Sequence, residues 1–164
     1  MFESVFWGEN NPHDYIGFLQ DDASERGLCY MFCNLYPATK RPILLALMAG
    51  EAAEFAEKNG DEQVVAVAMS ALRRAFPGAS SPVEAHVTRW GSDVNTMGCY
   101  SFMARDSKVN HHEALAREVD GRVFFAGEHT SRTHPAQVVG AMLSGVLAAG
   151  KVEAYARRGG HSFP

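Results

Sequence analysis

The chain has 164 residues, of which 46% are hydrophobic and 21% are charged, a composition that excludes an intrinsically disordered protein. Its length suits one domain or one large piece of a larger protein. The formal net charge of −4 argues against bulk nucleic-acid binding, so we expect no direct nucleic-acid contact by this segment.

Neither a membrane segment nor a secretory signal is expected. The longest apolar run, residues 43–50, is far shorter than the ~20 residues that cross a bilayer, and the N-terminus lacks the basic and apolar parts of a signal peptide. Cys29, Cys33 and Cys99 form no CxxC pair, and we expect buried, hydrophobic thiols in a reducing compartment. These features favour an intracellular protein that is not secreted. Because the chain starts directly with strand-like residues, we also expect that it begins in the middle of a fold.

The first half is predicted to hold short strands followed by two helices. Strand-like runs cover residues 4–7, 15–19, 28–35 and 43–47, and helical segments cover residues 50–58 and 61–76. Asp61 is the expected N-cap of the second helix. The apolar residues of that helix recur at i, i+4, i+7, i+8 and i+11, which indicates one buried stripe, formed by Val64, Ala68, Ala71, Leu72 and Ala75.

The second half follows residues 79–82, the only linker-like stretch. Strands are predicted at residues 83–90, 100–104 and 123–126, an exposed, histidine-rich segment at 107–118 and a long helix at 138–155. Small side chains recur on that helix and would let its backbone approach a sheet or a ligand, namely Gly140, Ala141, Ser144, Gly145, Ala148 and Ala149.

The stretch from Val123 to Thr130 is the strongest candidate for chemistry. An apolar run ends at Gly127, presents the carboxylate of Glu128 and enters a helix at Pro135. Gly127 permits close approach to a ligand, Glu128 can accept hydrogen bonds from a sugar or polyol hydroxyl, and a helix N-terminus attracts anions. An ordinary strand–loop–helix connection with a surface glutamate explains the same residues equally well.

A second candidate is an aromatic pair. Trp90 and Tyr100 lie ten residues apart, at the end of one predicted strand and the start of another. Two aromatic faces can enclose a cationic or amine group. The alternative is that each ring is simply part of a core or of its rim.

Several motifs occur in a fixed order: Arg89-Trp90, Asp93 and Gly98-x-Tyr100-Ser101, then residues 122–130, then Pro135 and Gly140-Ala141-x-x-Ser144-Gly145. Together they resemble the C-terminal part of the flavin-dependent amine oxidases, the family of polyamine oxidases, monoamine oxidases and lysine-specific histone demethylases. The resemblance extends from about Phe2 to Tyr155. Residues 5–7, 34–36 and 42–53 are most similar to the histone demethylase branch.

The resemblance implies an α/β fold of mixed α+β character: the C-terminal portion of a bilobed FAD-linked amine oxidase fold, without the N-terminal Rossmann βαβ unit. Residues 1–82 would be the remainder of the substrate-binding domain, residues 83–156 the C-terminal part of the FAD-binding domain, and residues 157–164 a flexible tail. The GxGxxG fingerprint is absent from the sequence. The family's flavin-contacting lysine would lie upstream of Met1. We therefore assign no catalytic residue and expect this chain alone to be an incomplete enzyme.

The resemblance also implies a cofactor, FAD, contacted by Ala126, Gly127, Glu128, Thr130, Ala136, Gln137 and Val138. The amine substrate would meet Trp90, Tyr100 and Gln137, the last at a position that is often aromatic or threonine in relatives. Cys99 replaces the serine of the family's Gly-Ser-Tyr. The implied reaction is oxidation of a C–N bond in a methylated lysine or a polyamine to an imine. The hydride goes to flavin N5, and oxygen is the final acceptor, giving hydrogen peroxide. A nuclear location would accompany a demethylase-like identity.

Two other functions compete with this interpretation. The chain is alternatively a non-catalytic, truncated fragment that packs against a partner, either the missing N-terminal half or another chain. A metal hydrolase is disfavoured, because His111 and His112 are adjacent and His129 and His134 lie five apart across a loop, with no HExxH helix. We predict no metal site.

Overall fold

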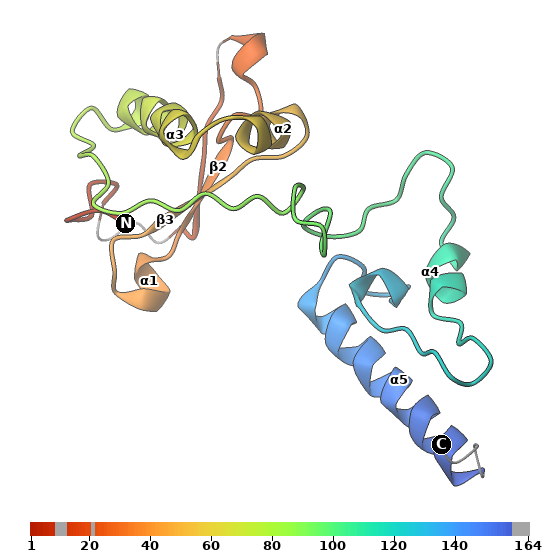
Figure 1. Ribbon diagram of the computed structural model, residues 1–164. Helices are drawn as coiled ribbons and strands as arrows, with labels where there is room; N and C mark the ends of the chain where they lie inside the picture. Colours follow the sequence, from red (N-terminus) through yellow and green to blue (C-terminus); the bar gives the residue numbers. More distant parts are fainter. Residues whose placement is uncertain (9–12, 21, 159–164) are drawn as a thin grey trace. The chain divides into compact units, whose positions relative to one another are not determined.

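The computed structural model describes residues 1–8, 13–20 and 22–158, and these fall into two compact units, Met1–Val94 and Asn95–Pro164 (Figure 1). We call them unit 1 and unit 2. Residues on either side of the boundary at residue 94 contact mainly their own unit. The assignment of residues 1–82 and 83–156 to substrate-binding and FAD-binding domains stays a prediction. Most of the expected tail, residues 159–164, lies outside the described residues.

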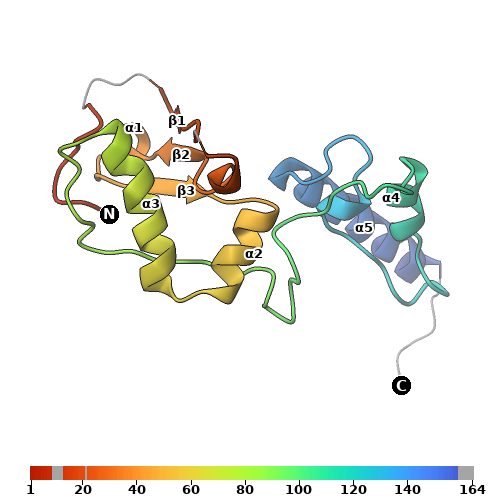
Figure 2. The same ribbon diagram turned by 90° about the horizontal axis from the view of Figure 1, so that it is seen from above.

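Unit 1 is a small antiparallel sheet with helices on one face (Figure 2). The strands are β1 (Tyr15–Gly17), β2 (Met31–Asn34) and β3 (Leu44–Leu47), in the order β1-β2-β3. Short helical turns η1 (Ala23–Glu25) and α1 (Tyr36–Thr39) connect the strands, and α2 (Glu51–Lys58) and α3 (Asp61–Ala75) follow them. The predicted strands at residues 15–19, 28–35 and 43–47 are thus confirmed in shorter form, and the predicted helices at residues 50–58 and 61–76 are confirmed.

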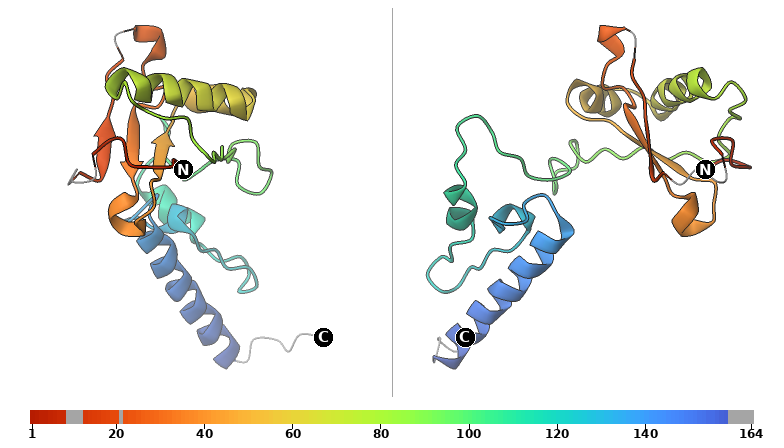
Figure 3. Two further views of the ribbon diagram at one scale, coloured as in Figure 1. Left: turned by 90° about the vertical axis from the view of Figure 1, so that its left-hand side faces the viewer. Right: turned by 180° about the vertical axis from the view of Figure 1, so that it is seen from behind.

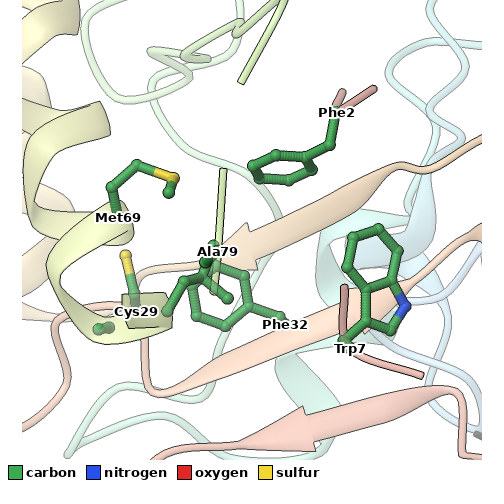
Figure 4. Packing of buried hydrophobic residues seen from close by; sticks show 8 residues of the cluster. Phe2, Trp7, Cys29, Phe32, Met69 and Ala79 are labelled. Carbon is green, nitrogen blue, oxygen red and sulfur yellow. The ribbon is translucent and has the colours of Figure 1, made fainter. Parts of the chain in front are cut away.

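The core of unit 1 is formed by side chains of α3, of the sheet and of the N-terminal segment, which pack against one another (Figure 4). Phe32 of β2 and Leu72 of α3 are both 2% exposed. Phe6 stacks edge-on against Trp7 with ring centroids 4.9 Å apart, a favoured aromatic geometry. The indole Nε1 of Trp7 donates to Oδ1 of buried Asn34 at 3.0 Å. The N-terminal segment is therefore fixed to β2 by both apolar and polar contacts.

Two segments of unit 1 differ from their expected form. Residues 4–7 form no strand. Their aromatic side chains pack in the core, and their backbone is not paired with the sheet. Residues 83–90 are also irregular. At their start, the backbone N–H of Val83 donates to the carbonyl of Met1 at 2.9 Å. In addition, Gly60 is the N-cap of α3, so Asp61 is its first helical residue and not its cap.

Unit 2 consists of α4 (Asn110–Leu115), the short turn η2 (Glu128–Thr130) and the long α5 (Val138–Arg157), connected by loops (Figure 3). The predicted helix at residues 138–155 is confirmed. The predicted strands at residues 100–104 and 123–126 do not form, and Val119–Val123 is an isolated bridge. A strand needs a hydrogen-bonded neighbour, and the described part of unit 2 offers none for these segments. Residues 107–118 are not uniformly exposed either, since they contain α4, in which His112 is buried.

Unit 2 has no buried hydrophobic side chain among its described residues. Its buried residues are His112, Thr130, Gly140 and Ser144. Large apolar side chains along α5 are exposed instead, among them Val138, Met142, Val146 and Leu147. Cys99 is also exposed, which corrects the expectation of three buried thiols; only Cys29 is fully buried, and burial raises its pKa to about 12.

The helix α5 is long and apolar enough to cross a membrane, by length and composition only. This corrects the expectation that no segment reaches that length. The expectation counted uninterrupted apolar runs, whereas Lys151 and Glu153 interrupt this helix without removing its apolar character. Core helices of soluble proteins meet the same criterion, so it does not by itself place α5 in a membrane.

The core of unit 1 yields a stability prediction. Leu72→Ala should lower the free energy of unfolding of unit 1 by about 2–5 kcal/mol, because it removes buried methyl groups and leaves a cavity. Urea unfolding followed by tryptophan fluorescence measures this, since Trp7 and Trp90 both belong to unit 1. Leu19→Ala, at a fully exposed leucine, is the matched control and should change the free energy by less than about 0.5 kcal/mol. Equal effects of the two substitutions would contradict the assigned core.

Candidate functional site

The centre of the candidate site is the turn at Gly127. Gly127 has φ 143°, a backbone conformation that side-chain-bearing residues rarely adopt, and a Cβ there would lie 2.5 Å from Cε1 of His129. Its carbonyl accepts from the hydroxyl of Thr130 at 2.8 Å. Its N–H donates to Oγ of Ser144 at 2.9 Å, on the buried face of α5. Glycine at this position therefore lets the turn close tightly against the helix.

Small residues on α5 receive this loop, as predicted for a close backbone approach. A Cβ at Gly140 would lie only 1.9 Å from the carbonyl oxygen of His134. The hydroxyl of Ser144 donates in turn to the carbonyl of Ala141 at 2.7 Å. On the other side of η2, Nδ1 of His112 lies 2.7 Å from the carbonyl oxygen of His129. The loop is therefore held between α5 and α4.

The carboxylate of Glu128 joins three segments of unit 2. Its Oε1 accepts from the backbone N–H of Ser101 at 2.9 Å, and its Oε2 accepts from the Ser101 hydroxyl and from the backbone N–H of Ala136, both at 2.6 Å. Bonds to an ionised acceptor are stronger than neutral ones. Glu128 thereby fixes the segment after Tyr100 and the turn before α5 in one arrangement. We call this set the Glu128 clamp.

The Glu128 clamp also sets the ionisation of its carboxyl group. Partial burial alone would raise the pKa of Glu128. The hydrogen bonds from Ser101 and Ala136, together with the nearby charge of His129, outweigh burial and hold the pKa below its ordinary value. The carboxylate is therefore ionised at neutral pH.

The start of α5 leaves backbone donors available. Gln137 is the N-cap, and no side chain caps the first turn. The first N–H groups of a helix have no partner inside it and carry a partial positive charge, which attracts anions. Ala136 and Gln137 are exposed, and Val138 is 86% exposed. The helix begins at Val138, three residues later than the predicted entry at Pro135.

The structure brings only part of the predicted site together. Gly127, Glu128, Thr130 and Ala136 share one hydrogen-bonded loop, with Gln137 and Val138 directly after it, and the exposed Ala126 directly before it. Tyr100, 64% exposed, precedes the serine held by the Glu128 clamp in unit 2. Trp90, 47% exposed, belongs to unit 1. The predicted aromatic pair is thus divided between the two units.

Sequence reasoning missed the residues that support the site. Ser101 stood in a quoted motif without a role, Ser144 was noted only as a small side chain, and His112 was expected in an exposed segment. Their partners lie 17 to 27 residues away along the chain. A hydrogen bond over such a separation leaves no periodic pattern in the sequence. The described residues include no group of three or more His, Cys, Asp or Glu side chains arranged as metal ligands.

Comparison with known proteins identifies relatives over nearly the whole chain. A family model described as flavin containing amine oxidoreductase matches residues 1–152. Histone demethylase-like protein A of Aspergillus fumigatus is 39% identical over 165 residues, which cover 93% of this chain and 15% of the relative. Polyamine oxidase 2 of Arabidopsis thaliana is 40% identical over 148 residues, covering 90% of this chain and 29% of the relative. Lysine-specific histone demethylase 2 of Homo sapiens is 36% identical over 158 residues, covering 94% and 19%. This chain spans less than a third of the length of each.

Mutation of Glu128 should reduce the protection of the Ser101 and Ala136 backbone amides from hydrogen exchange. Glu128→Gln replaces two charged acceptor oxygens by one neutral oxygen. The amide protons of Ser101 and Ala136 should therefore exchange with solvent roughly tenfold faster. This factor corresponds to the loss of about 1.5 kcal/mol, the contribution of a hydrogen bond to a charged group. Amide hydrogen exchange measured by NMR reads both positions directly. Glu118→Gln, at an exposed glutamate of the same unit, should leave both rates unchanged. Unchanged exchange rates in Glu128→Gln would show that Glu128 does not hold these two backbone amides.

The lowered pKa of Glu128 predicts a pH dependence of stability. Because the pKa is lower in the folded state, the ionised carboxylate contributes stability that is fully present above the unfolded value of about 4.3 and is lost as the pH falls through the folded value. The difference in free energy of unfolding between the wild type and Glu128→Gln should therefore shrink as the pH falls below about 4.3. Urea unfolding over a pH series measures that difference. A constant difference over this range would contradict the proposed ionisation.

Proposed function

The chain belongs to the flavin-containing amine oxidoreductase family, and from this premise we propose that it forms the C-terminal part of an FAD-dependent amine oxidase. Family membership implies a flavin, and the choice of FAD is part of the proposal. The observation that carries it is the Gly127 turn with the Glu128 clamp beside the uncapped start of α5. These residues are the ones that the family resemblance assigns to the flavin.

The residues present fit such a cofactor. Each carboxylate oxygen has two acceptor positions, and among the described residues Oε1 of Glu128 accepts only from the N–H of Ser101, which leaves one position for a hydroxyl of the ribityl chain. The uncapped first turn of α5 suits the edge of the flavin ring that becomes negative on reduction. Gly127 presents backbone without a side chain. We assign Ala126, Thr130 and Ala136 through Val138 to the lining of the same site.

The proposed roles divide between binding and orientation. When bound, FAD supplies two-electron oxidation of a substrate C–N bond to an imine, with oxygen as the final acceptor and hydrogen peroxide as the product. We assign Trp90, Tyr100 and Gln137 to contact with the substrate, the first two through their aromatic faces and the last through its polar side chain. We propose a methylated lysine or a polyamine as the substrate, because both demethylases and a polyamine oxidase are among the relatives. We assign no catalytic base to this chain.

The enzyme is completed by further polypeptide in our proposal. Unit 2 exposes a large apolar surface along α5 and buries no hydrophobic side chain among its described residues. Exposed apolar patches of this kind mark surfaces that pack against other protein. The relatives are more than three times as long as the matched segment. The partner is therefore additional flavoprotein chain, and we propose neither a membrane nor a nucleic-acid contact. We also propose an intracellular location, and a nuclear one if the substrate is a methylated histone lysine.

A non-catalytic role is the second candidate, and the same apolar surface favours it. A chain of this length then acts only by packing against a partner. Flavin binding separates the two functions, because packing alone requires no cofactor.

The proposal predicts that the chain retains flavin. After incubation with FAD and desalting, the protein should keep an absorption band near ~450 nm, and an amine substrate should bleach that band without oxygen once the further polypeptide that completes the enzyme is present. Spermine and a dimethyl-lysine peptide compared in the bleaching assay distinguish the two substrate classes. A colourless chain would favour the non-catalytic fragment.

A matched glycine pair tests the site itself. Gly127→Ala adds a Cβ into the His129 ring at a positive φ and should reduce the retained flavin band several-fold. Gly150→Ala, in α5 with open space around its Cβ, should leave the band unchanged. Equal retention by the two variants would place the flavin elsewhere.

A further inference from the structure

A second glutamate binds the segment that carries Trp90. Glu57 lies in the last turn of α2, and its Oε1 accepts from the backbone N–H of Gly91 at 2.8 Å. Its Oε2 accepts from the backbone N–H of Ser92 at 3.1 Å and from the Ser92 hydroxyl. Three donors from two consecutive residues thus converge on one side chain. The arrangement parallels the Glu128 clamp, in which the held serine directly follows Tyr100.

The other side of Trp90 is fixed by Arg89. One guanidinium nitrogen of Arg89 lies 2.7 Å from Oδ1 of Asp61, the first residue of α3, and another donates to the carbonyl of Asn59 at 2.7 Å. Trp90 is therefore held on both sides by the corner between α2 and α3. Residues 83–90 form no sheet, so no strand ladder sets the position of the indole.

Glycine at position 91 suits the close approach in this contact. A Cβ at Gly91 would lie 3.0 Å from Oε1 and 3.2 Å from Cδ of Glu57. A side chain here would therefore require the Glu57 carboxylate to shift by a few tenths of an ångström. The small size of Gly91 and the carboxylate of Glu57 thus both contribute to this contact.

The place of Glu57 in its helix argues against a role in helix stability. The C-terminal end of a helix carries partial negative charge, and a carboxylate there is unfavourable. Lys58, the next residue, pairs with Glu54 instead. Glu57 thus sits where its own helix disfavours it, and its favourable contacts are with the Trp90 segment.

We propose that Glu57 is a positioning residue that sets the position of the Trp90 indole for contact with the substrate by holding the backbone of Gly91 and Ser92. This inference rests on the proposed function only in giving Trp90 its place beside the substrate. The contact itself exists in the chain without any cofactor. Its test can therefore be separated from that of the function.

The test labels the two tryptophans with 5-fluorotryptophan and records their ¹⁹F NMR signals. Trp90→Phe assigns the signals, and buried Trp7 reports on whether unit 1 stays folded. Glu57→Ala should move the Trp90 signal toward that of the free amino acid, with the Trp7 signal unmoved. Glu57→Gln should move it part of the way, because the amide oxygen remains an acceptor. Glu54→Gln, at an exposed glutamate one turn away, should leave both signals in place.

A Trp90 signal that does not move in Glu57→Ala would overturn the proposal. If Glu57→Ala also displaces the Trp7 signal, Ser92→Ala decides, because it removes one donor and leaves α2 intact. Movement of Trp90 alone in Ser92→Ala supports the proposal, and no movement overturns it. If Trp90 responds to Glu57 but the chain retains no flavin, the positioning role stands and the proposed function fails.

Discussion

Two glutamates that accept backbone N–H groups hold irregular segments on which the proposed site depends. Glu128 binds Ser101 and Ala136, and Glu57 binds Gly91 and Ser92. A carboxylate offers several acceptor positions and a full charge, so one side chain can fix two irregular segments at once. Trp90 and Tyr100, the aromatic residues assigned to the substrate, each stand directly before a residue held in this way. Within each unit, the position of that aromatic residue therefore depends on the charge of one glutamate rather than on a strand.

The two units reach their stability by different means. Unit 1 has a conventional core, in which β2, α3 and the N-terminal aromatic residues bury Phe32, Leu72 and Trp7. The described part of unit 2 buries only His112, Thr130, Gly140 and Ser144, and its loops are tied to α5 by hydrogen bonds. Polar contacts alone stabilise modestly, because each exchanges a bond to water for a bond to protein. A surface as apolar as that of α5 is then best explained as one face of a larger interface, in agreement with the greater length of the relatives.

The sequence predicted the elements whose pattern is local. The 3.6-residue period of α3 placed Val64, Ala71 and Leu72 in the core, and the apolar, small-residue composition of residues 138–155 predicted α5. Residues 83–90, 100–104 and 123–126 have strand-like composition but form no strand, because a strand also needs a partner that the pattern of its own residues does not specify. The same limit applies to the site. Gly127 and Glu128 stood out from their own segment, whereas Glu57 and Ser101 gain their meaning from contacts far along the chain.

The Glu128 clamp and the proposed flavin contact require the same protonation state. A protonated carboxyl would lose acceptor capacity toward Ser101 and Ala136 and would also become a poorer partner for a ribityl hydroxyl. Hydrogen bonds from the protein that lower the pKa of Glu128 therefore prepare the one remaining acceptor position for a ligand before any ligand arrives. Preparation of this kind reduces the ordering cost of binding, because the loop and the start of α5 are already joined. The turn at Gly127 adds to the effect, since its N–H is already bound to Ser144 and the loop has little freedom left to lose.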